Sequence, residues 1–294
     1  GHPSRKFKGR VVFEGNYVRD ENHQAALFRE LGANPASMDA LRVIDAYAML
    51  PGHVLEQADA QQAYTQAKLE GIPTWVSLPR EAWPSHWGNF QNPVCPLRLA
   101  LYGHPDAGGY WEQHCHACLL RCGFVDIPDW PSVYWLPTSR VLLLVYVDDF
   151  KMSGPSQAVS DAWQCIRHEL LIGDPTPAKV FLGCTQHERT IDVSGTDGSF
   201  RVLEYDMEGF LQSCLDAFTE MTGDRVHHIS PTPYVAQASV SDPMRPQGSA
   251  APPSLEGRYA SVAPRILMKV LYAARLARAD RKSTRLNSSH EFVS

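Results

Sequence analysis

The 294-residue sequence lacks any apolar run near the roughly 18 residues that a membrane-spanning helix needs. Its first ten residues, GHPSRKFKGR, also lack the apolar centre of a secretory signal peptide. Cysteine occurs seven times, but the spacing does not repeat as it does in a small disulfide-stapled domain. These absences predict a soluble intracellular protein that has free thiols and no membrane partner.

A net positive charge is missing as well, since the chain carries −5 at pH 7. This balance argues against a nucleic-acid partner, which would favour a basic face. The charge is uneven, however: residues 1–10 carry +4, residues 255–294 carry +5, and the residues between them carry −14. The pattern fits a metal-binding centre flanked by phosphate contacts, and an acidic solvated surface explains it almost as well.

The length and the 44% hydrophobic content suffice for one large or two ordinary domains. We expect a core over residues 1–223 and an extended Pro/Ser-rich linker over residues 224–257. A helical closing segment follows over residues 258–280, where the apolar spacing predicts Leu267 and Val270 on the inner face. Residues 281–294 have no periodicity and are interpreted as a disordered, non-native tail.

One stretch stands out within the core. Residues 141–147 are apolar and run directly into Asp148 and Asp149, as expected for a buried strand that ends at a turn. Two acids at the end of a buried strand either reach water or bind a cation, because an isolated buried carboxylate is costly. A solvated Asp-Asp turn and a divalent-metal site are equally compatible with these residues alone.

A third acid favours the metal site. Residues 53–58 form a short strand pattern that ends at Asp59. Helices are predicted from Asn34–Pro35 to residue 50, from 106 to 123, from 155 to 173 and from 206 to 223, with a further strand at 179–184. This order predicts an α+β (mixed α/β) domain whose acids converge at one sheet edge.

The helix at residues 106–123 also carries a cluster of His and Cys residues. A zinc site is one interpretation, but the cluster consists of pairs four residues apart on a single helix, with no second pair at finger-like spacing. Buried free thiols are the favoured interpretation. The cluster comprises His114, Cys115, His116, Cys118 and Cys122.

Several segments match a known family in order along the chain. They are KGRVV at residues 8–12, LEQADAQQAYTQAKL at 55–69, LYGHPDAGGYW at 101–111, YVDD at 146–149, FLG at 181–183 and VAPRILMKVLYAARLARAD at 262–280. With these segments the chain resembles the reverse transcriptase of Ty1/copia-type LTR retrotransposons. Each motif is weak alone, but their order over residues 6–280 makes chance agreement implausible.

The resemblance implies a right-hand polymerase with fingers, palm and the start of a thumb or connection. Its activity would be RNA-directed DNA synthesis, in which a primer 3′-hydroxyl attacks a deoxynucleotide under two Mg²⁺ ions, with Mn²⁺ as an alternative. By the same resemblance, Asp59 and Asp148 would hold the metals and Asp149 would complete the catalytic and metal-binding set. Three hard oxygen donors at one sheet edge suit such a centre.

The resemblance also implies a nucleotide site. Tyr64 would occupy the space that a ribose 2′-hydroxyl needs, and Lys8 and Arg10 would grip the triphosphate. Asp106 departs from the family, which has Gln there, because an ionised Asp only accepts hydrogen bonds and repels phosphate. The remaining nucleotide-binding candidates are Tyr102, Gly103 and Tyr146.

The implied partners are an RNA template, a DNA primer and dNTPs, in a cytoplasmic retrotransposon particle or alternatively the nucleus. The family's RNase H and integrase parts lie outside this sequence and are further candidate partners. Two alternatives stay open. A decayed or fragmentary palm would bind nucleic acid without efficient polymerisation, and an unrelated Mg²⁺-dependent enzyme of phosphoryl transfer would hydrolyse rather than copy.

Overall fold

The computed structural model describes residues 9, 11–20, 22, 24, 26, 35–192, 198–225 and 259–277. Lys8, Arg10, most of the expected linker and the expected tail lie outside these residues, so their assignments stay predictions. The chain divides into two compact units. One comprises Gly1–Ala178 and Arg189–Leu203, and the other comprises Lys179–Glu188 and Glu204–Ser294.

The first unit is built on a six-stranded sheet in the order β4-β5-β6-β7-β1-β8, with every neighbouring pair antiparallel. The expected α+β (mixed α/β) class is therefore confirmed. The run at 141–147 forms the buried strand β6 as predicted, because five consecutive apolar side chains are buried there. The strands are β1 (His53–Asp59), β4 (Val125–Asp126), β5 (Val133–Leu136), β6 (Val141–Tyr146), β7 (Asp149–Pro155) and β8 (Thr176–Pro177).

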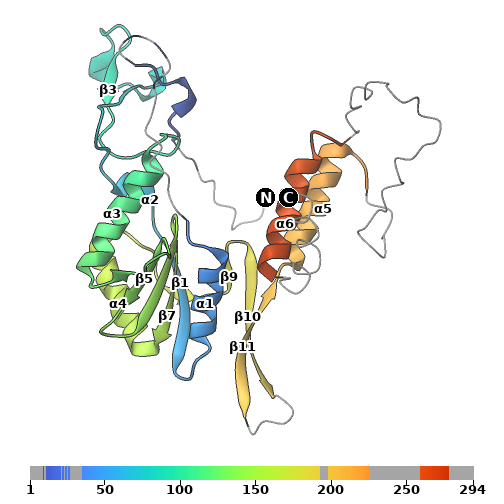
Figure 1. The fold of residues 1–294 in the computed structure, drawn as a ribbon. Helices are drawn as coiled ribbons and strands as arrows, with labels where there is room; N and C mark the ends of the chain where they lie inside the picture. The colour runs from blue at the N-terminus through green and yellow to red at the C-terminus, as the bar shows by residue number, and fades with distance from the viewer. Residues whose placement is uncertain are drawn as a thin grey trace, which may run out of the picture. The chain divides into compact units, whose positions relative to one another are not determined.

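Helices cover both faces of this sheet (Figure 1). On one face α3 (Ala107–Arg121) and α4 (Ser156–Glu169) bury Phe150 and Met152 of β7 in the main apolar core. The opposite face is covered by α1 (Met38–Ala48), which contacts β1, β6 and β7. Because strand side chains alternate between faces, Asp149, Lys151 and Ser153 all lie on the α1 face.

Two helix boundaries differ from the prediction. The prediction that α1 begins at Asn34–Pro35 was wrong, because Ser37 caps the helix by accepting a hydrogen bond from the Ala40 N–H at 3.1 Å. Likewise α4 ends at Glu169, well before Gly173, because Leu170 adopts an extended conformation. Local backbone geometry thus sets both boundaries: the Ser37 cap fixes where α1 begins, and the extended Leu170 fixes where α4 ends.

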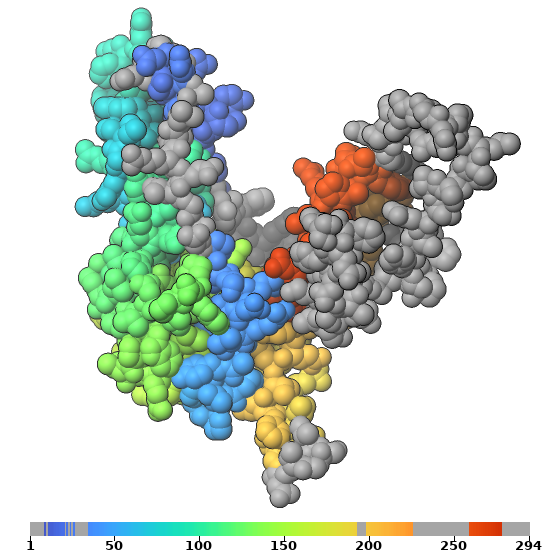
Figure 2. Space-filling model, viewed as in Figure 1, coloured from blue at the N-terminus to red at the C-terminus, as the bar shows by residue number. Residues whose placement is uncertain are grey.

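Residues 72–100 form loops and short elements. Two strands, β2 (Trp75–Ser77) and β3 (Val94–Pro96), pair antiparallel, and two 3₁₀ helices lie between them at Arg80–Ala82 and Ser85–Trp87. The segment around Phe13, dark blue in Figure 2, lies against Tyr102 and Gly103, since the Phe13 N–H donates to the Tyr102 carbonyl at 2.7 Å. Residues 11–13 form no strand, and Val11 and Val12 are exposed.

The second unit contains the ends of a three-stranded sheet, ordered β11-β10-β9, and two helices that pack together. The strand expected at 179–184 is instead a hairpin, because Leu182 and Gly183 both have positive φ and reverse the chain. The Tyr272 hydroxyl donates to the Leu182 carbonyl at 2.7 Å. The elements are β9 (Val180–Phe181), β10 (Cys184–Asp192), β11 (Ser199–Asp206), α5 (Glu208–Thr222) and α6 (Ala263–Ala277).

The closing helix α6 forms as predicted, but its inner face differs. Leu267 and Val270 are exposed, whereas Ala273 and Leu276 are buried. The remaining short elements are the helix α2 (Ala63–Gln66) and a 3₁₀ turn at Gly15–Tyr17. Among the described residues, no helix is both long enough and apolar enough to span a bilayer.

Candidate active site

Asp59 and Asp149 face each other across neighbouring strands. Asp59 is the last residue of β1, Asp149 is the first residue of β7, and the two are direct partners in the antiparallel register. Directly opposed residues have Cβ atoms about 5 Å apart on the same face of the sheet. The strand register therefore brings together two of the three predicted carboxylates.

The third carboxylate, Asp148, lies in the two-residue turn between β6 and β7. Tyr146 pairs with Asp149, so Val147 and Asp148 form the turn itself. The Asp148 carbonyl accepts a hydrogen bond from the Ala60 N–H at 2.7 Å, and the Asp59 carbonyl accepts one from Gly173 at 2.9 Å. Backbone contacts thus hold the end of β1 against the turn.

Val147 gives this turn an unusual conformation. Its φ is 60°, in the left-handed region that β-branched residues rarely adopt. The Val147 carbonyl accepts a short hydrogen bond, 2.6 Å, from the indole N–H of Trp111 on α3. Strained backbone of this kind persists where neighbouring structure holds it, and α3 supplies that support here.

The three acids Asp59, Asp148 and Asp149 form an electronegative cluster. Burial first, and then the charges of Asp148 and Asp59, raise the pKa of Asp149 to about 6. Like charges directly opposite each other destabilise a sheet, so this site holds negative charge that a cation would relieve. Within the described part of the chain, no three His, Cys, Asp or Glu side chains are already gathered as metal ligands.

The donor chemistry nevertheless fits Mg²⁺. All three side chains offer hard carboxylate oxygens, and two of them start from opposed positions on adjacent strands. The assignment of Asp59, Asp148 and Asp149 as metal ligands stays a prediction.

Tyr64 and Tyr102 form a ring pair beside this cluster. Their centroids are 4.5 Å apart and the ring planes are inclined by 48°. Burial, then the neighbouring Tyr102 and Asp148, raise the pKa of Tyr64, so its hydroxyl stays protonated at neutral pH. The Gln66 amide fixes the short helix that carries Tyr64, because it donates to the Leu171 carbonyl at 2.9 Å and accepts from the Leu171 N–H at 2.8 Å.

Gly103 follows Tyr102 at a point where no side chain fits. Its φ is +91°, and a Cβ there would overlap the carbonyl oxygen of Phe13. The Phe13 N–H in turn donates to the Tyr102 carbonyl at 2.7 Å. Glycine at 103 therefore allows the segment around Phe13 to lie directly on the backbone that carries Tyr102.

Asp106 precedes α3 and has a polar atom without a partner. Its Oδ1 is buried and makes no hydrogen bond to any described residue. Its backbone N–H donates to His104 Nδ1 at 3.2 Å, and the other ring nitrogen of His104 lies 3.3 Å from the Thr74 hydroxyl. Burial lowers the pKa of His104, so the ring is neutral and Nε2 carries the proton that Thr74 accepts.

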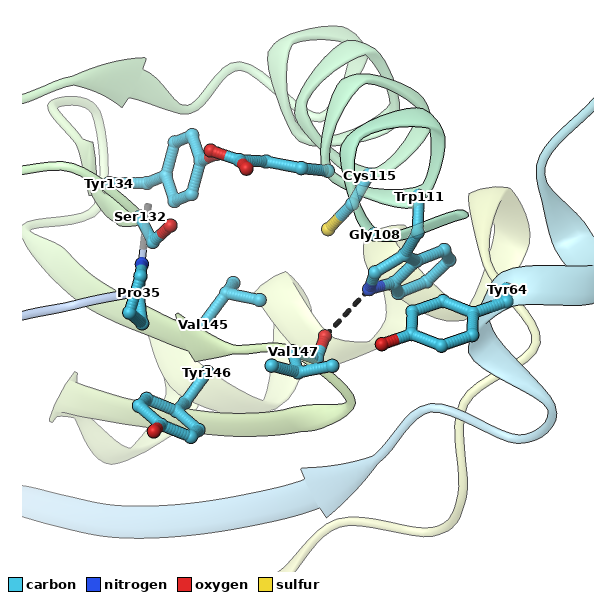
Figure 3. A pocket seen from close by; sticks show the side chains of 11 residues that line it. Pro35, Tyr64, Gly108, Trp111, Cys115, Ser132, Tyr134, Val145, Tyr146 and Val147 are labelled. Carbon is cyan, nitrogen blue, oxygen red and sulfur yellow. Dashed lines mark hydrogen bonds between the residues drawn. The ribbon is translucent and has the colours of Figure 1, made fainter. Parts of the chain in front are cut away.

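A pocket of about 170 Å³ opens beside the hairpin turn. Figure 3 shows it between α3, which contributes Trp111 and Cys115, and the hairpin, which contributes Val145 and Val147. Two predicted site residues, Tyr64 and Tyr146, also line it. The other lining residues are Pro35, Gly108, Glu112, Ser132 and Tyr134.

Two residues near the site were missed by the sequence reasoning. Trp111 holds the turn, and the only sequence signal for it was its place in the 101–111 motif. Lys151 follows the Asp-Asp pair by two residues, and its side chain is fully buried, with its Nζ 2.5 Å from Asp45 Oδ1 of α1. An aspartate at 45 inside an apolar helix stripe was the available signal for that ion pair.

Comparisons with known proteins agree with this arrangement. A family model described as "Reverse transcriptase (RNA-dependent DNA polymerase)" matches residues 2–223. Two curated relatives from Arabidopsis thaliana are the "Retrovirus-related Pol polyprotein from transposon RE1", 28% identical over 151 residues, and the "Retrovirus-related Pol polyprotein from transposon RE2", 26% identical over 151 residues. Each match covers 51% of this chain but only 10% of the relative. The resemblance to a retrotransposon reverse transcriptase is thereby confirmed.

Proposed function

Because the chain belongs to the reverse transcriptase (RNA-dependent DNA polymerase) family, we propose that it is the RNA-directed DNA polymerase domain of a copia-type retrotransposon polyprotein. The observation that carries the proposal is the opposition of Asp59 and Asp149 beside the Asp148 turn. In this proposal the six-stranded sheet with α1, α3 and α4 is the palm. Residues 11–20 and 72–100 belong to the fingers, and α5 and α6 begin the thumb or connection.

The chemistry follows from the proposed roles of the acids. Asp59, Asp148 and Asp149 would hold two Mg²⁺ ions, or Mn²⁺ as an alternative. These ions would neutralise charge on the attacking and leaving oxygens. Before metal arrives, burial and then the charges of Asp148 and Asp59 favour a proton on Asp149, whose pKa is raised to about 6. At pH 7 the Asp149 carboxyl group is mostly ionised and can accept a cation.

The remaining residues would bind and orient the substrates. Tyr64, packed against Tyr102, lies near Asp148, where its ring would exclude a ribose 2′-hydroxyl. Trp111 keeps the turn in place through the Val147 carbonyl, so Asp148 is presented at a fixed position. Lys8 and Arg10 are proposed to contact the triphosphate, and RNA template, DNA primer and dNTPs are the proposed partners.

Primer extension tests this function. The full chain, a DNA primer on an RNA template, Mg²⁺ and dNTPs should give extended product. Asp148→Asn should reduce the rate by at least about 100-fold, in line with losing a group that stabilises transition-state charge. Asp126→Asn, which changes an exposed acid on β4, is the matched control. Extension that is equal in wild type and Asp148→Asn would exclude the assignment.

Asp106 supports a second candidate function, the binding of nucleic acid without efficient polymerisation. Its buried Oδ1 has no described partner, and a carboxylate there would repel the phosphates of an incoming nucleotide. The domain would then bind primer–template in a strongly salt-dependent manner without efficient extension. Asp106→Gln should restore extension if this candidate is correct. It should change little if the wild-type domain already polymerises.

A further inference from the structure

Two half-buried cysteines meet where α3 packs against α4. Cys122 follows the last residue of α3, and Cys165 lies in the last turns of α4. All seven cysteines of the chain are free thiols. Since both side chains are only partly covered, small reagents in solution can reach them.

The contacts between the two helices fix the register that brings these thiols together. Arg121 Nε lies 2.7 Å from Glu169 Oε2, and Cys118 Sγ lies 3.8 Å from the Glu169 carbonyl oxygen. Cys122 is one turn beyond Cys118, and Cys165 is one turn before Glu169, so both thiols project from the same contacting faces. This register places the side chains of Cys122 and Cys165 next to each other, close enough to interact.

The two thiols differ in their surroundings. Burial first, and then the hydrogen bond to Cys165, raise the pKa of Cys122 well above that of a free thiol. Cys122 therefore remains protonated in the resting protein, and we assign the first attack to Cys165. This is the arrangement of an attacking and a resolving cysteine.

We propose that Cys122 and Cys165 form an oxidation site, at which a small disulfide such as oxidised glutathione converts the two thiols into one disulfide between α3 and α4. The Cys165 sulfur attacks the small disulfide, which forms a mixed disulfide and releases one small thiol. The Cys122 sulfur then attacks the mixed disulfide and releases the second. One S–S bond forms for each one broken, and the two protein protons leave with the two released thiols.

The new bond would stabilise the part of the fold that presents the acids. α4 packs on β7 and β1, which carry Asp149 and Asp59, and α3 holds the turn through Trp111. Closing a loop of roughly 40 residues removes entropy from the unfolded chain, and we expect the melting temperature to rise by about 5–10 °C. The inference does not depend on the proposed polymerase activity.

Mass spectrometry of the full chain tests the site. The folded protein is incubated with oxidised glutathione, remaining thiols are alkylated, and the chain is digested without reduction. We expect a linked peptide pair joining Cys122 to Cys165, a loss of two hydrogens, and the rise in melting temperature, all reversed by dithiothreitol. Alkylation of both residues without a linked pair would overturn the proposal, as would linkage of either residue to other cysteines at equal yield.

Serine variants separate the two roles. Cys122→Ser should trap a lasting glutathione adduct on Cys165, because the resolving thiol is gone. Cys165→Ser should abolish both the adduct and the temperature shift. Cys95→Ser is the matched control. Cys95 is also half-buried, but its thiol donates to the Val76 carbonyl at 3.8 Å and lies outside α3 and α4. The Cys95→Ser variant should oxidise at 122–165 as wild type does. A stable adduct on Cys165 in the wild-type chain would contradict a resolving role for Cys122.

Discussion

The rings of Tyr64 and Tyr102 lie 4.5 Å apart, although the two residues come from segments 38 positions apart in the chain. Tyr102 is itself held by the Phe13 N–H and followed by a glycine that no other residue can replace without moving the backbone. The pair therefore links the short helix after β1 to the segment that precedes α3. Tyr102 acts on the site through Tyr64, so it is a positioning residue.

Removing the Tyr102 ring should weaken sugar discrimination. A ring pair of this kind contributes about 0.5–1.5 kcal/mol, so Tyr102→Ala should raise the use of ribonucleotides relative to deoxynucleotides by up to about tenfold. The measurement is kcat/KM for a dNTP and for the matching rNTP. Tyr102→Phe keeps the ring and should behave as wild type. Equal loss of activity with both nucleotides would indicate a purely structural role.

The buried pair of Lys151 and Asp45 should show strong coupling. Lys151→Met leaves the Asp45 carboxylate uncompensated in the core and should lower the free energy of unfolding by about 3–5 kcal/mol. The double variant Asp45→Leu with Lys151→Met removes both charges and should recover most of that loss. Urea denaturation of the wild type, both single variants and the double variant gives the coupling free energy between the Asp45 and Lys151 side chains. Additive losses would contradict the prediction.

The turn at Val147 stores backbone strain that glycine should release. A β-branched residue at φ 60° costs on the order of 1–3 kcal/mol, and glycine loses about 0.5–1 kcal/mol in chain entropy. Val147→Gly should therefore raise the free energy of unfolding by about 1 kcal/mol in urea denaturation. Val125→Gly, on the exposed strand β4, should lower it. A loss in both variants would show that the turn is unstrained.

The Asp149 carboxyl should make the metal-free protein less stable as the pH rises. Its pKa is raised to about 6 in the folded state, above the ordinary value near 4, so the folded state binds the proton more tightly than the unfolded chain. Stability should fall between about pH 4 and pH 6 and then level off. Urea denaturation in EDTA across this range measures the effect. Asp149→Asn should remove this part of the slope, and an unchanged slope would contradict the assignment.

Much of the sheet could be predicted from local patterns. The apolar run of β6, the strand that ends at Asp59 and the apolar stripe of α4 each carry a strong periodic signal. Helix α1 was predicted with the wrong start, because Asn34–Pro35 and Ser37 are both good starting signals. Only the capping hydrogen bond of Ser37 shows which one is used.

The site was less accessible to sequence reasoning. The opposition of Asp59 and Asp149 depends on strand register, which no short-range pattern specifies. The contact from Trp111 to Val147 and the pair of Asp45 with Lys151 join residues more than 30 positions apart. Leu267 and Val270 were assigned to the inside of α6 from periodicity alone, but the face that packs on α5 is offset, with Ala273 and Leu276 inside.

The rate of the first nucleotide addition tests the central claim most directly. Enzyme bound to a DNA primer on an RNA template is mixed with one dNTP and Mg²⁺, and the product is followed in a single turnover. Asp59→Asn and Asp149→Asn should each slow the step by at least about 100-fold, and together by little more, because groups that act as a unit are not additive. Asp161→Asn, on the exposed side of α4, should match wild type. Nucleotide addition at the wild-type rate in Asp59→Asn or Asp149→Asn would contradict the account.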